Sequence, residues 1–363
     1  MLSAMGPHSS TTAPIFPAIA FSLVFTIAFA SSSQTTAAEG ARERPFYTKK
    51  MVRILVGFER GVAYDLYARL TADYFGRHIP GRPLVIVQNR PEVGTKTAES
   101  IYGAPPNGTA LAALTPALYF QQLITPDQAG YDWAKLTWIG SPTKSHYLLY
   151  MRTDAPYKTL QDISASSVPA VCGSGDEVTT GYYLPKLLEE TLGAKFKIVT
   201  GFKRGPDVDL AVERGELQCR ALTIDGFFSH EPYPTWLKTG FIRVLLQTGT
   251  KRDPRLPDVS TLNELMEQHK TSDSSRRLAK LILASSEFGR PVVGPPGMPA
   301  DRVKILRDGY RDTMKDPGLI AEAKKGNLEL NPATGEELET LAKEVVAQPP
   351  DIIERMQKLL KSK

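Results

Sequence analysis

The feature that most constrains the fold of this chain is a repeated succession of a short apolar run, a loop and a helical segment. Residues 52–56 and 84–88 are apolar runs typical of buried strands, and helical patterns follow them at 65–74 and 95–102. Asp65 is predicted to cap the first of these helices. Further strands are predicted at 167–172, 197–200, 217–224 and 241–246, and helices at 181–191, 301–314, 317–325 and 335–360. This alternation favours an α/β fold built on parallel sheets with crossover helices.

The N-terminus has the pattern of an export signal. Residues 15–30 (IFPAIAFSLVFTIAFA) are apolar, no charged side chain precedes Glu39, and Ala28-Phe29-Ala30 fits a cleavage site, with a second candidate after Ala38. The leading region has no Lys or Arg, which departs from the usual signal. The alternatives are a membrane anchor or a buried helix. We interpret residues 1–38 as a leader and expect a periplasmic, soluble protein.

Composition and motifs argue against several classes of protein. The net charge is +5, with 44 basic and 39 acidic residues interspersed, which fits attraction of small anions but not a nucleic-acid-binding tail. The five histidines are scattered and no metal-ligand spacing occurs. Gly173-Ser174-Gly175 lacks the third glycine of a dinucleotide fingerprint, and no arranged nucleophile and base are evident. We therefore predict no cofactor, no metal, no nucleic acid and no catalysis.

Two loops are candidates for ligand binding. Residues 57–65 and 173–180 each join the end of a predicted strand to the start of a helix, where free backbone N–H groups and the helix dipole favour anions. Two such loops in different halves of the chain suggest an anion held in a cleft. The two cysteines, Cys172 and Cys219, are permitted to pair in an oxidising compartment, although their spacing alone does not show that they meet.

An ordered series of motifs resembles one family, the periplasmic receptors of tripartite tricarboxylate transporters, also called the Bug family. The clearest stretch is residues 243–261 (RVLLQTGTKRDPRLPDVST), beside the family's R-A-L-A-V-T-x-x-x-R-x-x-x-L-P-D-V-P-T. Residues 85–91 (VIVQNRP) look like its V-V-V-E-N-R-P, and residues 172–175 (CGSG) like its Y-G-S-x-G loop. Similar matches occur at residues 55–65, 107–109, 201–205, 217–225 and 295–299.

The resemblance implies a type II, Venus-flytrap fold of two doubly wound domains joined by two crossing strands, near residues 146–152 and 242–247. Domain 1 would comprise residues 41–147 and 248–363, and domain 2 residues 148–247. The receptor is expected to be a monomer. The family also implies a small ligand held in the cleft and delivered to membrane permease subunits, and it places Cys172 and Cys219 on neighbouring strands. By position, the residues lining the cleft would be Phe58, Glu59, Arg60, Gly61, Val62, Ala63, Tyr64, Asp65, Gly94, Thr95, Ser174, Thr179, Thr180, Lys203 and Asp225.

The chain departs from the family in its glycine-rich loops. Glu59-Arg60-Gly61-Val62-Ala63 stands where the family has Pro-Pro-Gly-Gly-Gly, and side chains there restrict the approach of backbone amides to an anion. Four carboxylates near the proposed cleft would repel a dianion unless they face solvent: Glu59, Glu92, Asp176 and Glu177. The predicted ligand is therefore a mono-, di- or aromatic carboxylate, or a zwitterion. Two other functions stay open: a receptor that docks on a sensor protein, and an exported hydrolase.

Overall fold

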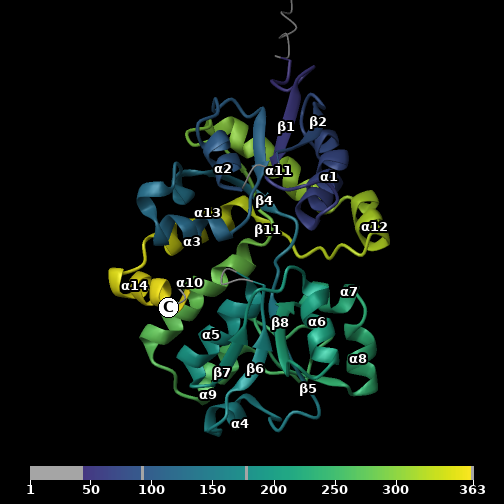
Figure 1. Ribbon diagram of the computed structural model, residues 1–363. Coiled ribbons are helices and arrows are strands. Elements are labelled where there is room, and N and C mark those ends of the chain that lie inside the picture. Colours follow the sequence, from purple (N-terminus) through teal and green to yellow (C-terminus); the bar gives the residue numbers. More distant parts are fainter. Residues whose placement is uncertain (1–43, 91–93, 176–178, 361–363) are drawn as a thin grey trace, which may run out of the picture. The chain divides into compact units, whose positions relative to one another are not determined.

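The strands of the protein form two separate sheets. The computed structural model describes residues 44–90, 94–175 and 179–360 (Figure 1). The first sheet has six strands in the order β11-β4-β10-β3-β1-β2, and the second has five in the order β7-β6-β8-β5-β9. The strands of the first sheet are β1 (Met51–Val56), β2 (Leu84–Asn89), β3 (Ala110–Ala113), β4 (Thr137–Ser141), β10 (Val292–Gly294) and β11 (Ala333–Thr334). Those of the second are β5 (Tyr147–Arg152), β6 (Ala170–Gly173), β7 (Phe196–Val199), β8 (Cys219–Thr223) and β9 (Ile242–Gln247).

The six-stranded sheet is covered on both faces, as the apolar runs in its strands require. Successive side chains of a strand point to opposite faces, and Ile54 and Val56 join one buried cluster while Leu55 joins another. The first cluster lies under α1 (Ala63–Phe75), α11 (Ala300–Thr313) and α12 (Pro317–Lys325). The second lies under α2 (Gly94–Tyr102), α3 (Ala117–Ile124) and α13 (Gly335–Val346). Strands β1, β2 and β3 are parallel, whereas β10 runs antiparallel to β3 and β4.

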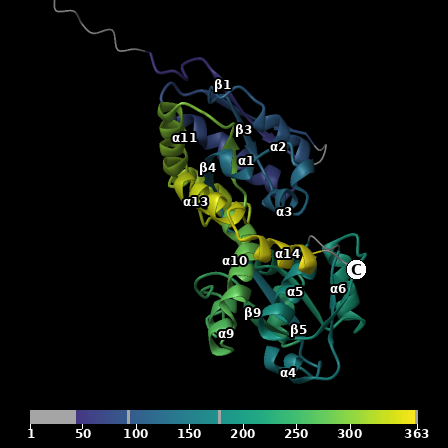
Figure 2. The ribbon, with the colours of Figure 1, turned by 90° about the vertical axis from the view of Figure 1, so that its left-hand side faces the viewer.

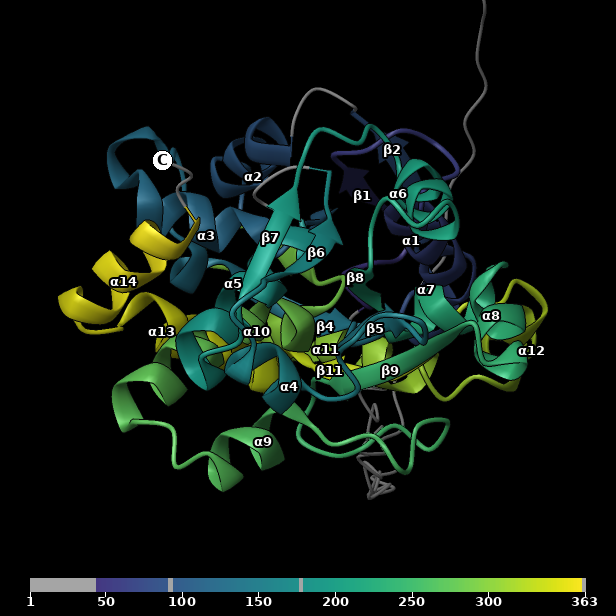
Figure 3. The ribbon, with the colours of Figure 1, turned by 60° about the horizontal axis from the view of Figure 1, so that its bottom comes forward.

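The five-stranded sheet is built in the same way. In β5, Leu148 and Tyr150 face one buried cluster, and Leu149 and Met151 face the other. One face carries α6 (Gly205–Glu213), α7 (Ile224–Ser229) and α8 (Tyr233–Thr239), which lie together beside the strands in Figure 3. Around the other face lie α4 (Leu160–Ala165), α5 (Thr180–Leu192), α9 (Leu262–Gln268) and α10 (Asp273–Phe288). Two covered sheets confirm the predicted α/β, doubly wound fold class.

The carboxyl edges of the two sheets are joined by one short segment. Strand β4 runs parallel to β3, since both are antiparallel to β10, so Ser141 ends at the same edge as the other parallel strands. Tyr147, which begins β5, pairs with Thr223 at the carboxyl end of β8. Residues 142–146, here called the link, therefore connect one carboxyl edge with the other, and they span at most roughly 20 Å. Loops that follow strands in either sheet start from these two edges.

The return from the second sheet to the first runs through helices. After β9 the chain forms α9 and α10, and it rejoins the six-stranded sheet at β10. Helix α10 packs against α5, α13 and α14 (Pro350–Leu360), and Figure 2 shows it beside α13 and α14. The larger buried cluster is continuous from Ala98 on α2, through Leu278 on α10, to Leu187 on α5. The two sheets thus share one apolar core along this side.

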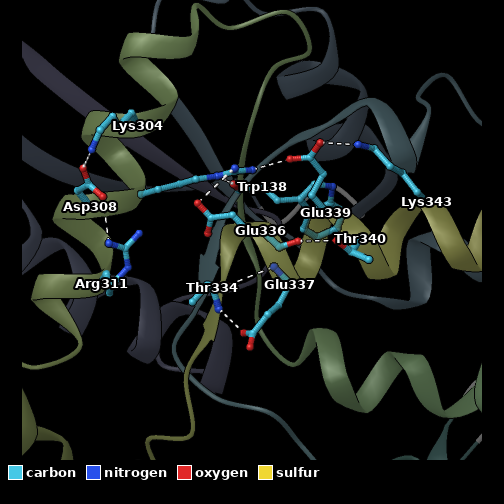
Figure 4. A network of polar contacts seen from close by, with 11 residues as sticks. Trp138, Lys304, Asp308, Arg311, Thr334, Glu336, Glu337, Glu339, Thr340 and Lys343 are labelled. Atoms are coloured by element: carbon cyan, nitrogen blue, oxygen red, sulfur yellow. Dashed lines mark hydrogen bonds and ion pairs between the residues drawn. The ribbon is translucent and has the colours of Figure 1, made fainter.

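The C-terminal helical segment differs from the prediction. The expected helix over 335–360 is two helices, α13 and α14, because Pro349 and Pro350 cannot continue the hydrogen-bond ladder of a helix. Thr334 and Glu337 form a capping box at the start of α13 (Figure 4). The guanidinium of Arg307 on α11 donates to the Trp138 carbonyl oxygen at 2.8 Å and to Glu339 at 2.7 Å, which fixes both α11 and α13 to β4.

Cys172 and Cys219 are joined by a disulfide. They are opposite one another on the adjacent strands β6 and β8, with Cα atoms 4.5 Å apart, and both are fully buried. The bond closes a sequence separation of 47 residues. It ties together two strands whose carboxyl ends lead into candidate ligand-binding loops.

Candidate functional site

The loop after β1 is organised by Asp65. The predicted role of this residue as a helix cap is wrong, because α1 begins two residues earlier, at Ala63. The carboxylate is instead buried inside the loop, where it accepts hydrogen bonds from the Gly61 amide at 2.9 Å, Asn89 at 2.8 Å and Arg69 at 3.0 Å. Burial by itself raises the pKa of Asp65, but these bonds and the charge of Arg69 lower it below its usual value. Asp65 therefore holds the shape of the loop as an anion.

The other predicted residues of this loop fall into two groups. The rings of Phe58 and Tyr64 stack at 4.4 Å with an interplanar angle of 12°. Burial raises the pKa of Tyr64, and this is opposed by the positive charge of Arg290 and a hydrogen bond with Thr115. The side chains of Glu59, Arg60 and Val62 are exposed. The stacked pair Phe58 and Tyr64 is thus the less exposed part of the loop, and Tyr64 lies near Thr115 and Arg290.

Two further strand ends of the six-stranded sheet meet this loop. A Cβ atom on Gly57 would lie 2.9 Å from Oγ1 of Thr97 and 3.1 Å from the Cα of Gly94, so α2 begins directly against the loop. A Cβ atom on Gly94 would touch Thr115, which follows β3. Thr95 does not cap α2 but donates to Oε1 of Gln121 at 2.8 Å. The ends of β1, β2 and β3 therefore converge on one place, as parallel strands require.

The loops of the five-stranded sheet enclose a pocket of about 320 Å³. The hydroxyl groups of Ser174 and Thr179 are 2.8 Å apart, and the Ser174 amide donates to the Val199 carbonyl oxygen, which fixes the loop to β7. The pocket brings together four of the predicted residues, with Phe202 as an apolar wall. These four are Ser174, Thr179, Thr180 and Lys203.

Arg290 is the residue that the sequence reasoning missed. It lies between the end of α10 and β10, at the carboxyl edge of β3, and its side chain is 13% exposed. Its guanidinium lies 4.7 Å from the ring centroid of Tyr67 and 5.7 Å from that of Tyr64, both on α1. On its other side, Nη2 is 3.7 Å from Oδ2 of Asp225 on α7. The only signal in the sequence is a cation two positions before the apolar run Val292-Val293.

The two sheets approach each other around this arginine. Burial raises the pKa of Tyr183 on α5, and the electrostatic influence of Tyr64 adds to this rise. The Tyr183 hydroxyl lies 3.2 Å from Oγ1 of Thr180. Asp225 lines a second polar pocket of about 410 Å³ with Lys144 and His146 of the link. Groups from both sheets and from the link thus surround one region at the carboxyl edges.

Three of the carboxylates that the sequence analysis placed near the cleft lie outside the described residues: Glu92, Asp176 and Glu177. Within residues 44–90, 94–175 and 179–360, no group of histidine, cysteine, aspartate and glutamate side chains has the arrangement of a metal site. In that same part of the chain, no helix combines the length and the apolar character that a membrane span needs. The predicted leader, residues 1–38, lies outside the described residues.

A family model identifies the chain. Residues 68–358 match the model of the tripartite tricarboxylate transporter family receptor. The protein belongs to this family. The receptor is also 26% identical over 345 residues to a curated protein of Cupriavidus necator, a UPF0065 protein, with 91% of this chain and 96% of that protein covered.

Solved structures share the fold of the receptor. A solute-binding protein of the same family from Polaromonas has a TM-score of 0.68 at 17% identity, covering 86% of this chain and 99% of its own. Two proteins of Rhodopseudomonas palustris, one with bound malate and one with adipate, have TM-scores of 0.55 and 0.56 at 18% identity. They cover 86% of this chain and 99% and 97% of their own chains. The receptor therefore has the periplasmic binding protein fold, and its family consists of solute-binding receptors.

Proposed function

We propose that this protein is an exported receptor that captures a small carboxylate-bearing solute between the carboxyl edges of its two sheets and delivers it to the permease of a tripartite transporter. Membership of the receptor family supports solute binding, and the malate and adipate bound by two structural relatives make small carboxylates the first candidates. The apolar stretch at residues 15–30 supports export.

The observation that carries the proposal is the convergence of loops from both sheets on Arg290. Helices α1 and α5 begin at these loops, and the first turn of a helix offers unpaired backbone N–H groups and a partial positive charge. Arg290 and Lys203 add full positive charges on either side. An anionic group between the sheets would contact hydrogen-bond donors from both sheets. A pocket on the surface of one sheet would offer donors from that sheet alone.

Ligand-driven closure is the mechanism that this architecture favours. The chain passes between the sheets twice, through the link and through the segment that joins α10 to β10. A ligand that contacts both carboxyl edges binds the closed arrangement better than an open one, so it shifts the population toward closure. The closed receptor is then the form that a permease recognises.

The direct test is to purify the protein without added ligand, denature it and identify released small molecules by mass spectrometry. A thermal-shift series with mono-, di- and aromatic carboxylates follows, since a ligand specific for the folded state raises the melting temperature by mass action. We expect a stoichiometric carboxylate or a concentration-dependent shift. A protein that releases nothing and responds to none of these acids would refute the proposal.

A further inference from the structure

The ion pair between Arg290 and Asp225 is incomplete. Its closest approach, from Nη2 to Oδ2, is 3.7 Å, longer than a hydrogen bond. Nη1 of Arg290 donates to Oγ of Ser145 on the link at 2.9 Å. In the part of the chain that the structure describes, Nε of Arg290 and Oδ1 of Asp225 are buried and lack hydrogen-bond partners. The pair therefore leaves one buried donor and one buried acceptor unsatisfied between the sheets.

Aromatic rings pack against the arginine of this pair. Tyr67 and Tyr64 lie against the guanidinium, and burial raises the pKa of both phenols, that of Tyr67 to about 12. Both phenols are therefore neutral at physiological pH, and they add apolar surface rather than charge. In such surroundings of low polarity, an uncompensated charge is strongly disfavoured.

The charges of the pair restrict the ligand that fits. Arg290 and Asp225 together carry no net charge, so a dicarboxylate that pairs with the guanidinium would bring its own negative charge close to the Asp225 carboxylate. A ligand with a carboxylate and an ammonium group on neighbouring atoms would satisfy both side chains at once. Discrimination of this kind combines a favourable contact for one ligand with repulsion of another.

We propose that the receptor selects zwitterionic amino acids, with Arg290 binding the ligand carboxylate and Asp225 binding its ammonium group. This inference rests on the proposed function, because it names the ligand class for the same region between the sheets. Arg290 and Asp225 act here as the residues that determine specificity.

Two matched pairs of probes test the inference: glutamate against glutarate, and phenylalanine against 3-phenylpropionate. The members of each pair differ by one ammonium group. We expect the aminated member of at least one pair to bind roughly tenfold or more tightly, as measured by isothermal titration calorimetry on the full mature chain. Asp225→Asn should abolish most of that preference, Asp225→Glu should retain part of it, and Arg290→Gln should weaken both members.

Arg311→Gln and Asp312→Asn, two exposed positions on α11, are the matched controls and should bind as the unmodified protein does. Thermal melts of every variant separate loss of binding from loss of folding. Equal or tighter binding of glutarate and 3-phenylpropionate would overturn the inference and leave the receptor function standing. If none of the four probes binds and a released ligand lacks an ammonium group, the inference is likewise overturned; if no carboxylate of any kind binds, both proposals fail.

Discussion

Nε2 of His146 lies 2.8 Å from Oε1 of Glu287. His146 is the last residue of the link, and Glu287 is the last residue but one of α10, directly before the segment that joins α10 to β10. This contact therefore ties together the two passages of the chain between the sheets. Lys144, also on the link, lies 3.1 Å from the other oxygen of the same carboxylate. The passages that would flex on closure are thus bound to each other through one glutamate.

This contact predicts a loss of stability in acid. Burial by itself raises the pKa of Glu287, but the hydrogen bond and charge of His146 and the charge of Lys144 lower it from 4.5 to about 2. Between these two values the unfolded chain takes up a proton and the folded protein does not, so the free energy of unfolding falls as the pH falls. The loss should be on the order of 2 kcal/mol, allowing for a carboxylate that is 28% exposed.

The free energy of unfolding can be measured by urea unfolding between pH 5 and pH 2, in steps of about one pH unit. Glu287→Gln should flatten the dependence in that range, whereas Glu267→Gln, at an exposed position on α9, should leave it unchanged. Identical pH profiles for the protein and the Glu287→Gln variant would contradict the assignment.

Gly289→Ala should destabilise the protein severely. Gly289 has φ +60°, and a Cβ atom there would lie 1.7 Å from the carbonyl oxygen of Thr143 on the link, a contact that only a backbone shift can relieve. We expect a loss of about 3 kcal/mol or more in urea unfolding. Gly297→Ala is the matched control: its φ is +74° but nothing lies within 4 Å of the new Cβ. Gly297→Ala should lower the free energy of unfolding by about 1–2 kcal/mol, the cost of placing a non-glycine residue in the left-handed region. Equal losses of stability at both positions would contradict the predicted clash with Thr143.

The disulfide should be detectable by thiol titration and should contribute to stability. Denatured, unreduced protein is expected to show no reactive thiols, and reduced protein two, from Cys172 and Cys219. Replacing both residues by alanine should lower the free energy of unfolding by about 2–4 kcal/mol, because the bond restricts the unfolded chain. Two reactive thiols before reduction would show that the bridge does not form.

Lys203→Ala should weaken the binding of carboxylates without altering the fold. Its side chain is exposed and lines the pocket with Ser174 and Thr180, so its removal deletes a positive charge but no core contact. We expect the dissociation constant of glutamate or glutarate, whichever binds more tightly, to rise roughly three- to tenfold. Lys197→Ala, on an exposed position of β7, should leave it unchanged. An unaltered dissociation constant would remove Lys203 from the site.

Local pattern predicted most of the elements that build the two sheets. The strand at Val52–Val56 and the helix that begins after Thr334 depend on neighbouring residues alone, through apolar alternation and a capping box. Strand β10 does not stand out in the sequence, because it has only three residues. Helix α10 was not predicted either, although Ser272 caps its start and Gly289 follows its last residue. The helix break at Pro349 and Pro350 is encoded locally, because proline cannot continue the hydrogen-bond ladder of a helix.

What the sequence by itself determined is the fold class, the family, and the loops that follow each parallel strand, since these depend on short-range periodicity and on ordered motifs. Only the tertiary structure decided what the side chains at those loops do. The carboxylate of Asp65 turns inward and accepts a hydrogen bond from its own loop. Arg290 contacts Tyr67, which is 223 positions away in the sequence, and Asp225, which is 65 positions away. Contacts of that range are fixed by how the sheets pack, and no local pattern encodes them.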